Sequence, residues 1–323
     1  MSVVGAAAPV PYGLGAASAR VRATGPGTTL APTMPTYLAD IVAAHRRAAA
    51  ADGRDLGELM DRALASAPPP PFGGALLLGP PGEGAVETAA GAAGSPRLAV
   101  IAEIKRRSPS RGLLAPDLDP AATAGAYAAG GATCLSVLTD RQYFGGSASD
   151  LVAARLASGL PALRKDFTVS VADVCDARLM GASAVLLIVA ALADAELTRF
   201  LAAAGELGID ALVEVHDGAE LDRALSVGAG MVGVNQRDLA TFAVDPDRAE
   251  RLAEAIPDDV VAVAESGIAG RSDAARLAAA GYRAVLVGEA LVRAADPSSA
   301  VAALAGHPVA QRPARAGGGL GAR

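Results

Sequence analysis

Short, mostly apolar runs recur along the chain, and stretches with apolar residues at helical spacing separate them. The runs predict buried strands over 98–105, 134–139, 162–165, 184–189, 211–215, 231–235, 260–265 and 284–288. The stretches between them that predict helices include 121–130, 171–181, 192–207, 218–226, 246–255 and 271–280. Eight strand–helix units over about 210 residues favour an α/β fold of the (β/α)8 TIM-barrel type over a doubly wound sheet, which usually has fewer strands.

The pattern changes on both sides of the predicted barrel, 98–307. Helical spacing within 34–67 predicts two helices that precede the first strand and pack on the barrel. Proline, glycine and alanine dominate 68–97, which predicts an irregular, disordered insert. We also expect disorder in the extension 1–33 and in the tail 308–323. Because Met34 stands just before the first helical pattern, translation starting there is a further hypothesis.

Composition excludes several classes of protein. A net charge of −6 and 3% aromatic residues do not fit a nucleic-acid-binding surface. The longest strongly apolar stretch, 184–193, is about half of a membrane-spanning helix, so we expect a soluble protein. Cys134 and Cys175 lack C-x-x-C spacing, which favours a reducing compartment and a cytoplasmic location.

No phosphate-binding P-loop and no metal-ligand spacing occurs, so we expect no metal. Gly228, Gly230 and Gly233 fit the G-x-G-x-x-G spacing of dinucleotide-binding folds. They close a predicted helix and enter a strand, whereas that fingerprint must follow a strand and open a helix. The motif therefore does not predict a nucleotide site.

Polar residues end nearly every predicted strand. They are Glu103 with Lys105, Thr139 with Asp140, Lys165 with Asp166, Glu214, Asn235 with Arg237, and Glu265 with Ser266. In a barrel these ends form one mouth, where active sites lie. We expect burial and the nearness of Lys105 to Lys165 to lower the pKa of one of these lysines, and burial near other carboxylates to raise the pKa of Glu214. A salt-bridged ring that only seals the barrel remains the alternative.

Small residues follow the last two strands, at Gly267 and Gly288. Loops at these places in such barrels commonly bind phosphate, although tight turns without a ligand are the alternative. His216 follows Glu214 by two positions and could relay protons, but a lone histidine is more often a structural hydrogen-bonding residue, and we favour that. We expect His45 and His307 to lie outside the mouth.

Eight motifs in order carry a resemblance. They are IAEIKRRSPSRG, LSVLTDRQYFGGS, LRKDF, GASAVLLIVAAL, LVEVHD, GVNQRDLATF, VAESGI and VLVGEALVR. Together they resemble the indole-3-glycerol-phosphate synthase family of tryptophan biosynthesis over 98–297. The resemblance implies a barrel that closes 1-(2-carboxyphenylamino)-1-deoxyribulose 5-phosphate to an indole, with loss of carbon dioxide and water and without a cofactor.

The resemblance also implies residue roles. Lys165 resembles the general acid that protonates the ribulose carbonyl, Lys105 would hold the substrate carboxylate and serve the dehydration, and Glu214 resembles the general base of that later step. The orienting positions are Glu103, Asn235 and Arg237, with Glu265 and Ser266 beside them. The phosphate-loop positions are Ser108, Gly267, Gly288 and Glu289, and the apolar wall positions are Phe144, Phe167, Leu186, Ile188 and Leu239.

Two departures and two alternatives accompany the resemblance. The 68–97 insert is foreign to the family and puts in doubt how the preceding helices, which in the family help to cover the mouth, are docked. Gln236 stands where many members have Asn or Ser.

A sugar-phosphate isomerase is the first alternative function. That reaction requires a Cys or Asp as its base, whereas the first strand here ends in Glu and Lys. The second is a catalytically silent barrel acting as a binding subunit. The expected partner is a phosphorylated small molecule. A monomer is compatible with the sequence, and so is association with other tryptophan-pathway enzymes.

Overall fold

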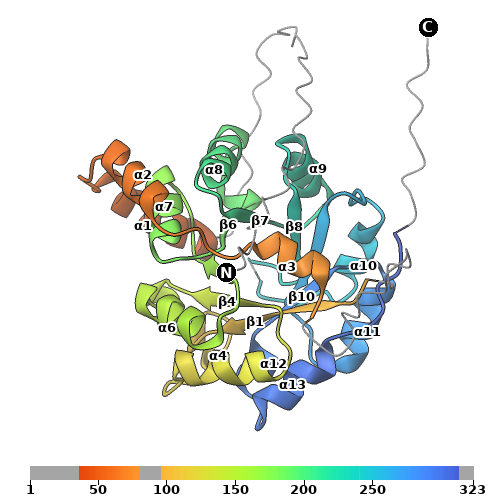
Figure 1. Cartoon of the computed structure of the whole chain (residues 1–323). Coiled ribbons are helices and arrows are strands. Elements are labelled where there is room, and N and C mark those ends of the chain that lie inside the picture. Colours follow the sequence, from red (N-terminus) through yellow and green to blue (C-terminus); the bar gives the residue numbers. More distant parts are fainter. Residues whose placement is uncertain (1–35, 81–95, 240, 313–323) are drawn as a thin grey trace, which may run out of the picture. The chain divides into compact units, whose positions relative to one another are not determined.

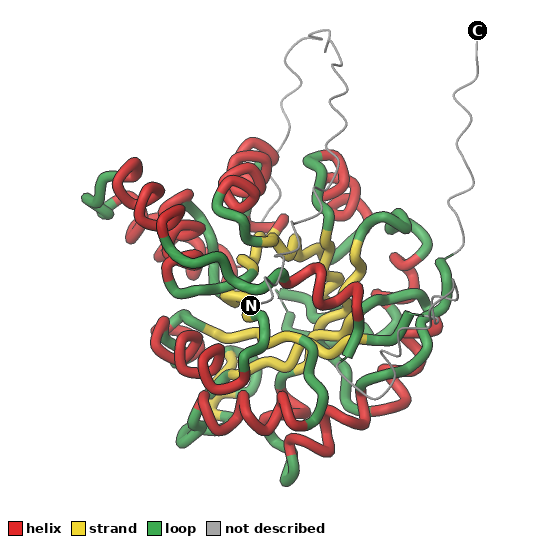
Figure 2. Tube along the Cα trace, in the orientation of Figure 1, coloured by secondary structure: helices red, strands yellow, loops and turns green. Residues whose placement is uncertain are grey.

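Eight parallel strands close into a barrel in the computed structural model, which describes residues 36–80, 96–239 and 241–312 (Figures 1 and 2). The barrel strands are β1 (Ala99–Ile104), β4 (Cys134–Leu138), β5 (Ala162–Lys165), β6 (Ala184–Ile188), β7 (Asp210–Val215), β8 (Met231–Asn235), β9 (Val261–Glu265) and β10 (Ala284–Val287). The predicted (β/α)8 fold and its eight strands are therefore confirmed. The apolar runs form these strands because both faces of a parallel barrel strand are buried.

Helices lie around the barrel (Figure 2). They are α4 (Pro120–Ala129), α5 (Arg141–Phe144), α6 (Ala148–Ser158), α7 (Val171–Leu179), α8 (Asp194–Glu206), α9 (Gly218–Ser226), α10 (Arg248–Ala253), α11 (Arg271–Ala279), α12 (Glu289–Val292) and α13 (Pro297–Leu304). A 3-10 turn, η1 (Val189–Ala191), precedes α8. Aspartate or serine side chains cap several helix starts, as Ser170 does for α7 and Asp217 for α9. Gly228 and Gly230 lie between α9 and β8, as the sequence predicted, so the glycine motif opens no helix.

Strand register brings the strand-end polar residues to one level. Glu265 is opposite Asn235, Glu214 is opposite Gly233, and Glu103 is opposite Ser136. Because all pairs are parallel, these residues share the carboxyl-terminal mouth of the barrel.

Three helices precede the barrel in the sequence, and the third crosses the end of the barrel opposite the mouth. Helix α1 (Thr36–Ala50) lies at the mouth, and α2 (Leu56–Ala65) packs on α7. Helix α3 (Phe72–Leu78) crosses in front of the strands in Figure 1. The backbone N–H groups of Phe72 and Gly73 donate to the carboxylate of Asp210, the first residue of β7, at 3.0 and 2.8 Å. The third helix therefore seals the amino-terminal end of the barrel.

Helix α3 corrects the expectation that all of 68–97 is irregular. Phe72 and Leu76 are fully buried against the barrel, and this burial outweighs the local effect of the neighbouring prolines and glycines. The part of the insert from 81 to 95 lies outside the described residues, as does the extension 1–33.

The chain beyond 307 also differs from the expected disordered tail. Val309 is buried, and the Arg312 guanidinium donates to the carbonyl oxygens of Pro257 and Val260 at 2.6 and 2.9 Å. The ordered chain thus reaches at least to Arg312, and 313–323 lie outside the described residues. A hairpin of β2 (Arg107–Ser108) and β3 (Gly112–Leu113) at the mouth was not predicted.

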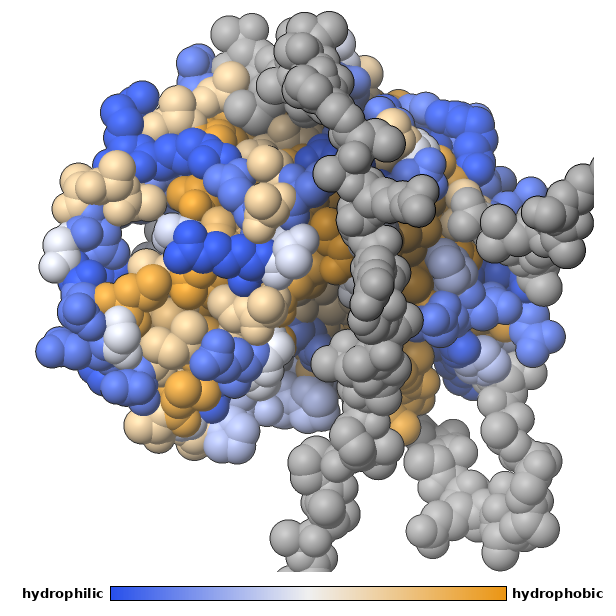
Figure 3. Space-filling model, turned by 90° about the horizontal axis from the view of Figure 1, so that it is seen from above, coloured by the Kyte–Doolittle hydropathy of each residue, from blue (hydrophilic) through white to orange (hydrophobic). Residues whose placement is uncertain are grey.

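Within the part of the chain that the structure describes, no helix combines the length and apolarity needed to cross a membrane. On the face drawn in Figure 3, hydrophilic residues form much of the outline, and apolar residues gather between them.

Candidate active site

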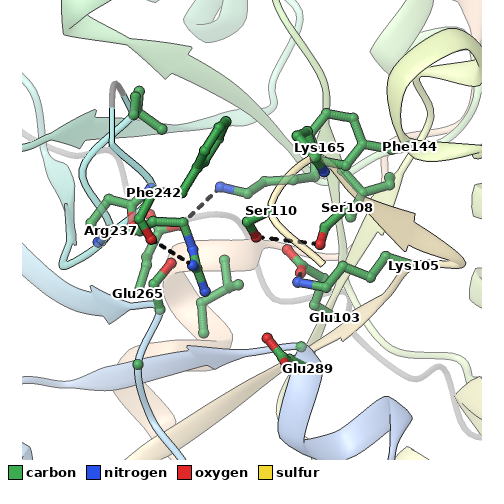
Figure 4. Close-up of a pocket in the computed structure, with 18 of the residues that line it drawn as sticks. Glu103, Lys105, Ser108, Ser110, Phe144, Lys165, Arg237, Phe242, Glu265 and Glu289 are labelled. Carbon is green, nitrogen blue, oxygen red and sulfur yellow. Dashed lines mark hydrogen bonds and ion pairs between the residues drawn. The ribbon is translucent and has the colours of Figure 1, made fainter. Parts of the chain in front are cut away.

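The carboxyl ends of the barrel strands surround a cavity of about 670 Å³. All eight barrel strands contribute to its lining, together with α1 and the β2–β3 hairpin. Every residue to which the resemblance assigned a role lines this one cavity: Glu103, Lys105, Ser108, Phe144, Lys165, Phe167, Leu186, Ile188, Glu214, Asn235, Arg237, Leu239, Glu265, Ser266, Gly267, Gly288 and Glu289. Of the other strand-end residues, Asp166 lines it as well, whereas Thr139 and Asp140 do not. Lys105 and Lys165 are the only lysines in the chain. Figure 4 shows both extending into the same pocket.

Lys165 sits between two buried carboxylates. Its Nζ lies 2.8 Å from Glu214 Oε2 and 2.8 Å from Glu265 Oε2. Burial opposes the ammonium charge, but the charges of Glu214, Glu265 and Glu103 outweigh it and raise the pKa of Lys165 far above its ordinary value. The predicted lowering of a lysine pKa is contradicted at Lys165, because these carboxylates, rather than the Lys105 ammonium, dominate its surroundings.

The two carboxylates that share Lys165 respond in opposite directions. Burial alone would raise the pKa of Glu214, but Lys165, His216 and Asn235 together hold it below its usual value. Burial and the neighbouring charge of Glu214 outweigh Lys165 at Glu265 and raise its pKa to about 7. The expected elevation at Glu214 was therefore wrong, and the group that takes up a proton near neutral pH is Glu265. Its Oε1 atom is buried without a hydrogen-bond partner among the described residues.

Lys105 has one carboxylate partner instead of two. Its Nζ donates to Glu103 Oε1 at 2.6 Å, and Ser136 Oγ donates to Glu103 Oε2 at 3.4 Å. The Lys105 side chain is 17% exposed, against 6% for Glu103. The second ammonium is thus anchored on one side and open to the cavity on the other.

An apolar wall faces the two lysines. The rings of Phe144 and Phe167 lie 6.2 Å apart, and Leu186, Ile188 and Leu239 line the same cavity. Three side chains of α1 that were not predicted as site residues complete the wall, namely Tyr37, Leu38 and Ile41. The Tyr37 ring packs edge-on against Phe242 at 5.5 Å. The spacing of Leu38 and Ile41 predicted a buried helix face, but nothing in that pattern indicates that the face covers a site.

At the end of the cavity near β9 and β10, the backbone adopts an unusual conformation. Ser266 and Gly267 have φ values of 64° and 70°, a region that a residue with a side chain rarely adopts. The Glu289 carboxylate lies 3.4 Å from Arg111 of the hairpin and 3.5 Å from Arg293. Asn235 Oδ1 accepts the backbone N–H of Arg237 at 3.0 Å, and Arg237 donates to the carbonyl oxygen of Phe242 at 3.1 Å. Gln236 is not among the described residues that line the cavity, and its side-chain amide nitrogen donates to the Ser266 carbonyl oxygen at 2.8 Å.

His45 on α1 reaches the strand ends at the rim, and, as expected, it is not among the described residues that line the cavity. Its Nε2 lies 3.1 Å from Asp140 Oδ2 and 4.0 Å from Asp166 Oδ1. Burial lowers the pKa of His45, but the hydrogen bond that its ring donates to Asp140 and the charges of Asp166, Asp140 and Asp173 outweigh it, so the pKa is raised. His45, Asp140 and Asp166 are also the one group of His, Cys, Asp or Glu side chains among the described residues with the arrangement to hold a metal ion. Asp166 is already bound by Arg164 and Thr139, however, and Asp140 accepts the backbone N–H groups of Tyr143 and Phe144.

Comparison with known proteins agrees with the geometry. A family model described as Indole-3-glycerol phosphate synthase matches residues 87–304. A protein of that name from Nocardioides sp. is 57% identical over 215 residues, which cover 67% of this chain and 82% of the relative. One from Azospirillum brasilense is 50% identical over 208 residues, covering 64% of this chain and 79% of the relative. One from Mycobacterium ulcerans is 46% identical over 283 residues, covering 87% and 98%. The chain belongs to the indole-3-glycerol phosphate synthase family.

Proposed function

We propose that the cavity carries out the family's reaction, the decarboxylating and dehydrating ring closure of 1-(2-carboxyphenylamino)-1-deoxyribulose 5-phosphate to indole-3-glycerol phosphate in tryptophan biosynthesis. One observation carries this assignment: the only two lysines of the chain meet the strand-end glutamates Glu103, Glu214 and Glu265 in one cavity, between an apolar wall and a glycine-containing end. The substrate offers matching parts, since it has an aromatic ring, a carboxylate, a carbonyl group and a phosphate.

Lys165 is the proposed general acid. As the aryl carbon attacks the ribulose carbonyl, negative charge develops on the carbonyl oxygen. An ammonium with a strongly raised pKa is a poor acid toward water, yet it still protonates an alkoxide, which is a much stronger base than an amine. The two carboxylates hold its Nζ at a fixed place in the cavity, so that the acid is positioned before the charge appears.

Lys105 and Glu214 are proposed for the remaining steps. Lys105 holds the substrate carboxylate until carbon dioxide leaves, and then donates a proton to the departing hydroxyl group. Glu214 keeps a lowered pKa and is therefore ionised at neutral pH, as a general base for the dehydration must be. Glu103, Asn235, Arg237, Glu265 and Ser266 would orient the substrate and these groups, and the apolar wall would hold the anthranilate ring.

The phosphate is assigned to the end of the cavity formed by Ser108, Gly267, Gly288 and Glu289. The glycines allow an anion to approach the backbone. At Glu289 the backbone, rather than the side chain, would face the phosphate, because the carboxylate is already engaged by Arg111 and Arg293. We further propose a cytoplasmic location, since both cysteines are free and buried.

The test is conversion of the carboxyphenylamino substrate, followed by indole fluorescence. The purified full-length chain should turn the substrate over, and Lys165→Ala should abolish turnover while the circular dichroism spectrum stays that of the parent. Isomerisation of phosphoribosylanthranilate without indole formation would identify the isomerase alternative, and binding without any turnover would identify a silent barrel. Near-normal turnover by the Lys165 variant would overturn the assigned roles.

A further inference from the structure

Gln236 connects the loops that follow two neighbouring strands, β8 and β9. Its backbone N–H donates to the Glu265 carbonyl oxygen at 2.9 Å, and its own carbonyl oxygen accepts the N–H of Asp245 at 2.8 Å. Its side-chain amide nitrogen donates to the Ser266 carbonyl oxygen at 2.8 Å. Figure 4 shows Arg237 and Glu265, which adjoin Gln236 and Ser266 in the chain, on the same side of the pocket. The Gln236 backbone is thus fixed on both sides, so its side chain can hold the turn that follows β9.

That turn has a conformation that needs support. Ser266 and Gly267 have φ values of 64° and 70°, and a residue with a side chain, such as Ser266, rarely adopts this left-handed region. Such a conformation persists where the surrounding contacts hold it. Gln236 supplies one of these contacts from a position that is only 1% exposed. Its Oε1 atom has no hydrogen-bond partner among the described residues, so the bond to Ser266 is the one that its side chain makes with them.

The hydrogen bond to Ser266 also determines where the next N–H group points. The peptide bond between Ser266 and Gly267 is trans, and in a trans peptide the C=O and N–H groups point in opposite directions. Gly267 lines the cavity, whereas Gln236, which holds the carbonyl oxygen, is not among the described residues that line it. The Gly267 N–H is therefore directed away from Gln236, and it makes no hydrogen bond with the described residues. Such an N–H group is a donor available to an anion.

We propose that Gln236 is a positioning residue for the substrate phosphate. By holding the Ser266 carbonyl oxygen, it keeps the Gly267 N–H directed at the phosphate, without touching the substrate itself. The role belongs to this chain's own glutamine, at a position where many family members have Asn or Ser. The inference rests on the proposed assignment of the phosphate to the end of the cavity that contains Gly267.

A purely structural role for Gln236 makes different predictions. If its amide only tied the loops after β8 and β9 together, its loss would weaken the binding of every part of the substrate alike. A residue that orients one N–H group should affect ligands that carry a phosphate and leave other ligands unchanged. The phosphate takes no part in the bond changes, so its contacts are equal in the ground state and the transition state. KM should therefore change while kcat does not.

The experiment compares the full-length parent with Gln236→Met, which keeps the length of the side chain but removes the donor. The control is Gln311→Met, a change at an exposed glutamine that is not among the residues lining the cavity. Isothermal titration calorimetry with glycerol 3-phosphate, a phosphate ester without an aromatic ring, probes one end of the site. Titration with anthranilate, an aromatic carboxylate without a phosphate, probes the other.

We expect Gln236→Met to weaken the binding of glycerol 3-phosphate about 10-fold, the size expected when one hydrogen bond to a charged group is weakened. Anthranilate binding should stay within about twofold of the parent, because the Gly267 N–H does not face the ring. In steady-state kinetics, KM for the carboxyphenylamino substrate should rise about 10-fold and kcat should stay within about twofold. Gln311→Met should behave like the parent in all these measurements.

Each other outcome contradicts the inference. Parental binding of glycerol 3-phosphate by Gln236→Met would overturn it, as would an equal loss of anthranilate binding, a fall in kcat with unchanged KM, or a parent that binds no glycerol 3-phosphate. Should Gln236→Met fail to fold, Gln236→Asn decides. Asparagine keeps an amide in the buried position but is shorter by one methylene group, so its donor falls short of the Ser266 carbonyl oxygen, and the same selective loss is expected.

The proposed function is tested separately by turnover of the parent. A parent that binds glycerol 3-phosphate but forms no indole product would refute the proposed function. The calorimetric comparison would still decide the role of Gln236 in that case, because it does not depend on turnover.

Discussion

The base and the rim of the cavity are built in different ways. At the base, Lys165, Glu214 and Glu265 stand on strands whose register fixes their relative positions. At the rim, α1 and the β2–β3 hairpin are positioned by side-chain contacts, such as those of His45 with Asp140 and of Arg111 with Glu289. Chemistry that depends on the base should therefore be lost when one functional group is removed. Functions of the rim should instead change gradually with the strength of its contacts.

The largest effect is expected at the centre of the base. Lys165→Met keeps much of the side-chain volume but removes the general acid, so kcat should fall by about 10³-fold or more. Two carboxylates would then lack a common cation, but Glu265 already holds a proton near neutral pH, and its pKa should rise further, which limits the loss of stability. Steady-state kinetics with thermal unfolding checks both. Arg47→Met, an exposed substitution at the end of α1, is the control.

The same contrast explains what the sequence could predict. The residues of the base were found because apolar runs locate strands, and parallel strands bring their ends together. The pKa directions of Lys165 and Glu214 were not found, because they depend on which carboxylate approaches which ammonium, to within about an ångström. The rim residues Tyr37 and His45 were missed as functional candidates because helical spacing shows only that one face is buried. The helix α3 was missed since its few apolar residues are surrounded by prolines and glycines.

A second prediction tests how closely the base is packed. A Cβ added at Gly288 would collide with Glu103 Oε1 and Lys105 Nζ, although the backbone φ of −121° suits any residue. Gly288→Ala should therefore shift the Lys105–Glu103 pair and reduce kcat/KM by about 10²-fold, the effect of displacing a reacting group by about 1 Å. Gly270→Ala is the control, since an added Cβ meets nothing within 4 Å there. Equal activity of the two variants would show that the pair has room to move.

The third prediction concerns the proton on Glu265. Its pKa of about 7 in the folded protein exceeds its value of 4.5 in an unfolded chain. The native state therefore binds more protons between these values, and the free energy of unfolding should fall as pH rises from about 4.5 through 7. Glu265→Gln should flatten this part of the stability–pH curve, measured by denaturant titration. A curve that keeps its slope would assign the titration to another group.

The smallest effect is expected at the rim, where His45 joins α1 to the barrel. Its pKa is raised in the folded protein, so its contribution to stability should be fully present below the unfolded value of 6.5 and should be lost as pH rises through the folded value. The pKa of Asp140 is lowered, so its carboxylate remains charged in this range. Because the pair is partly exposed, His45→Ala should cost no more than about 1 kcal/mol at pH 5.5 and less at pH 8.5.

The same variant should distinguish closure of the cavity from its chemistry. Helix α1 supplies Tyr37, Leu38 and Ile41 to the apolar wall. It supplies none of the charged side chains at the bottom of the cavity, which come from the strands. Loosening it should therefore raise KM severalfold and leave kcat within about twofold, since binding of the aromatic ring is lost equally in the ground state and the transition state. His307→Ala, which removes a histidine whose ring nitrogen lies 3.4 Å from a backbone carbonyl oxygen of α13, is the control. A fall in kcat with unchanged KM would mean that the rim takes part in positioning Lys165, through the adjoining Asp166, and that base and rim are one unit.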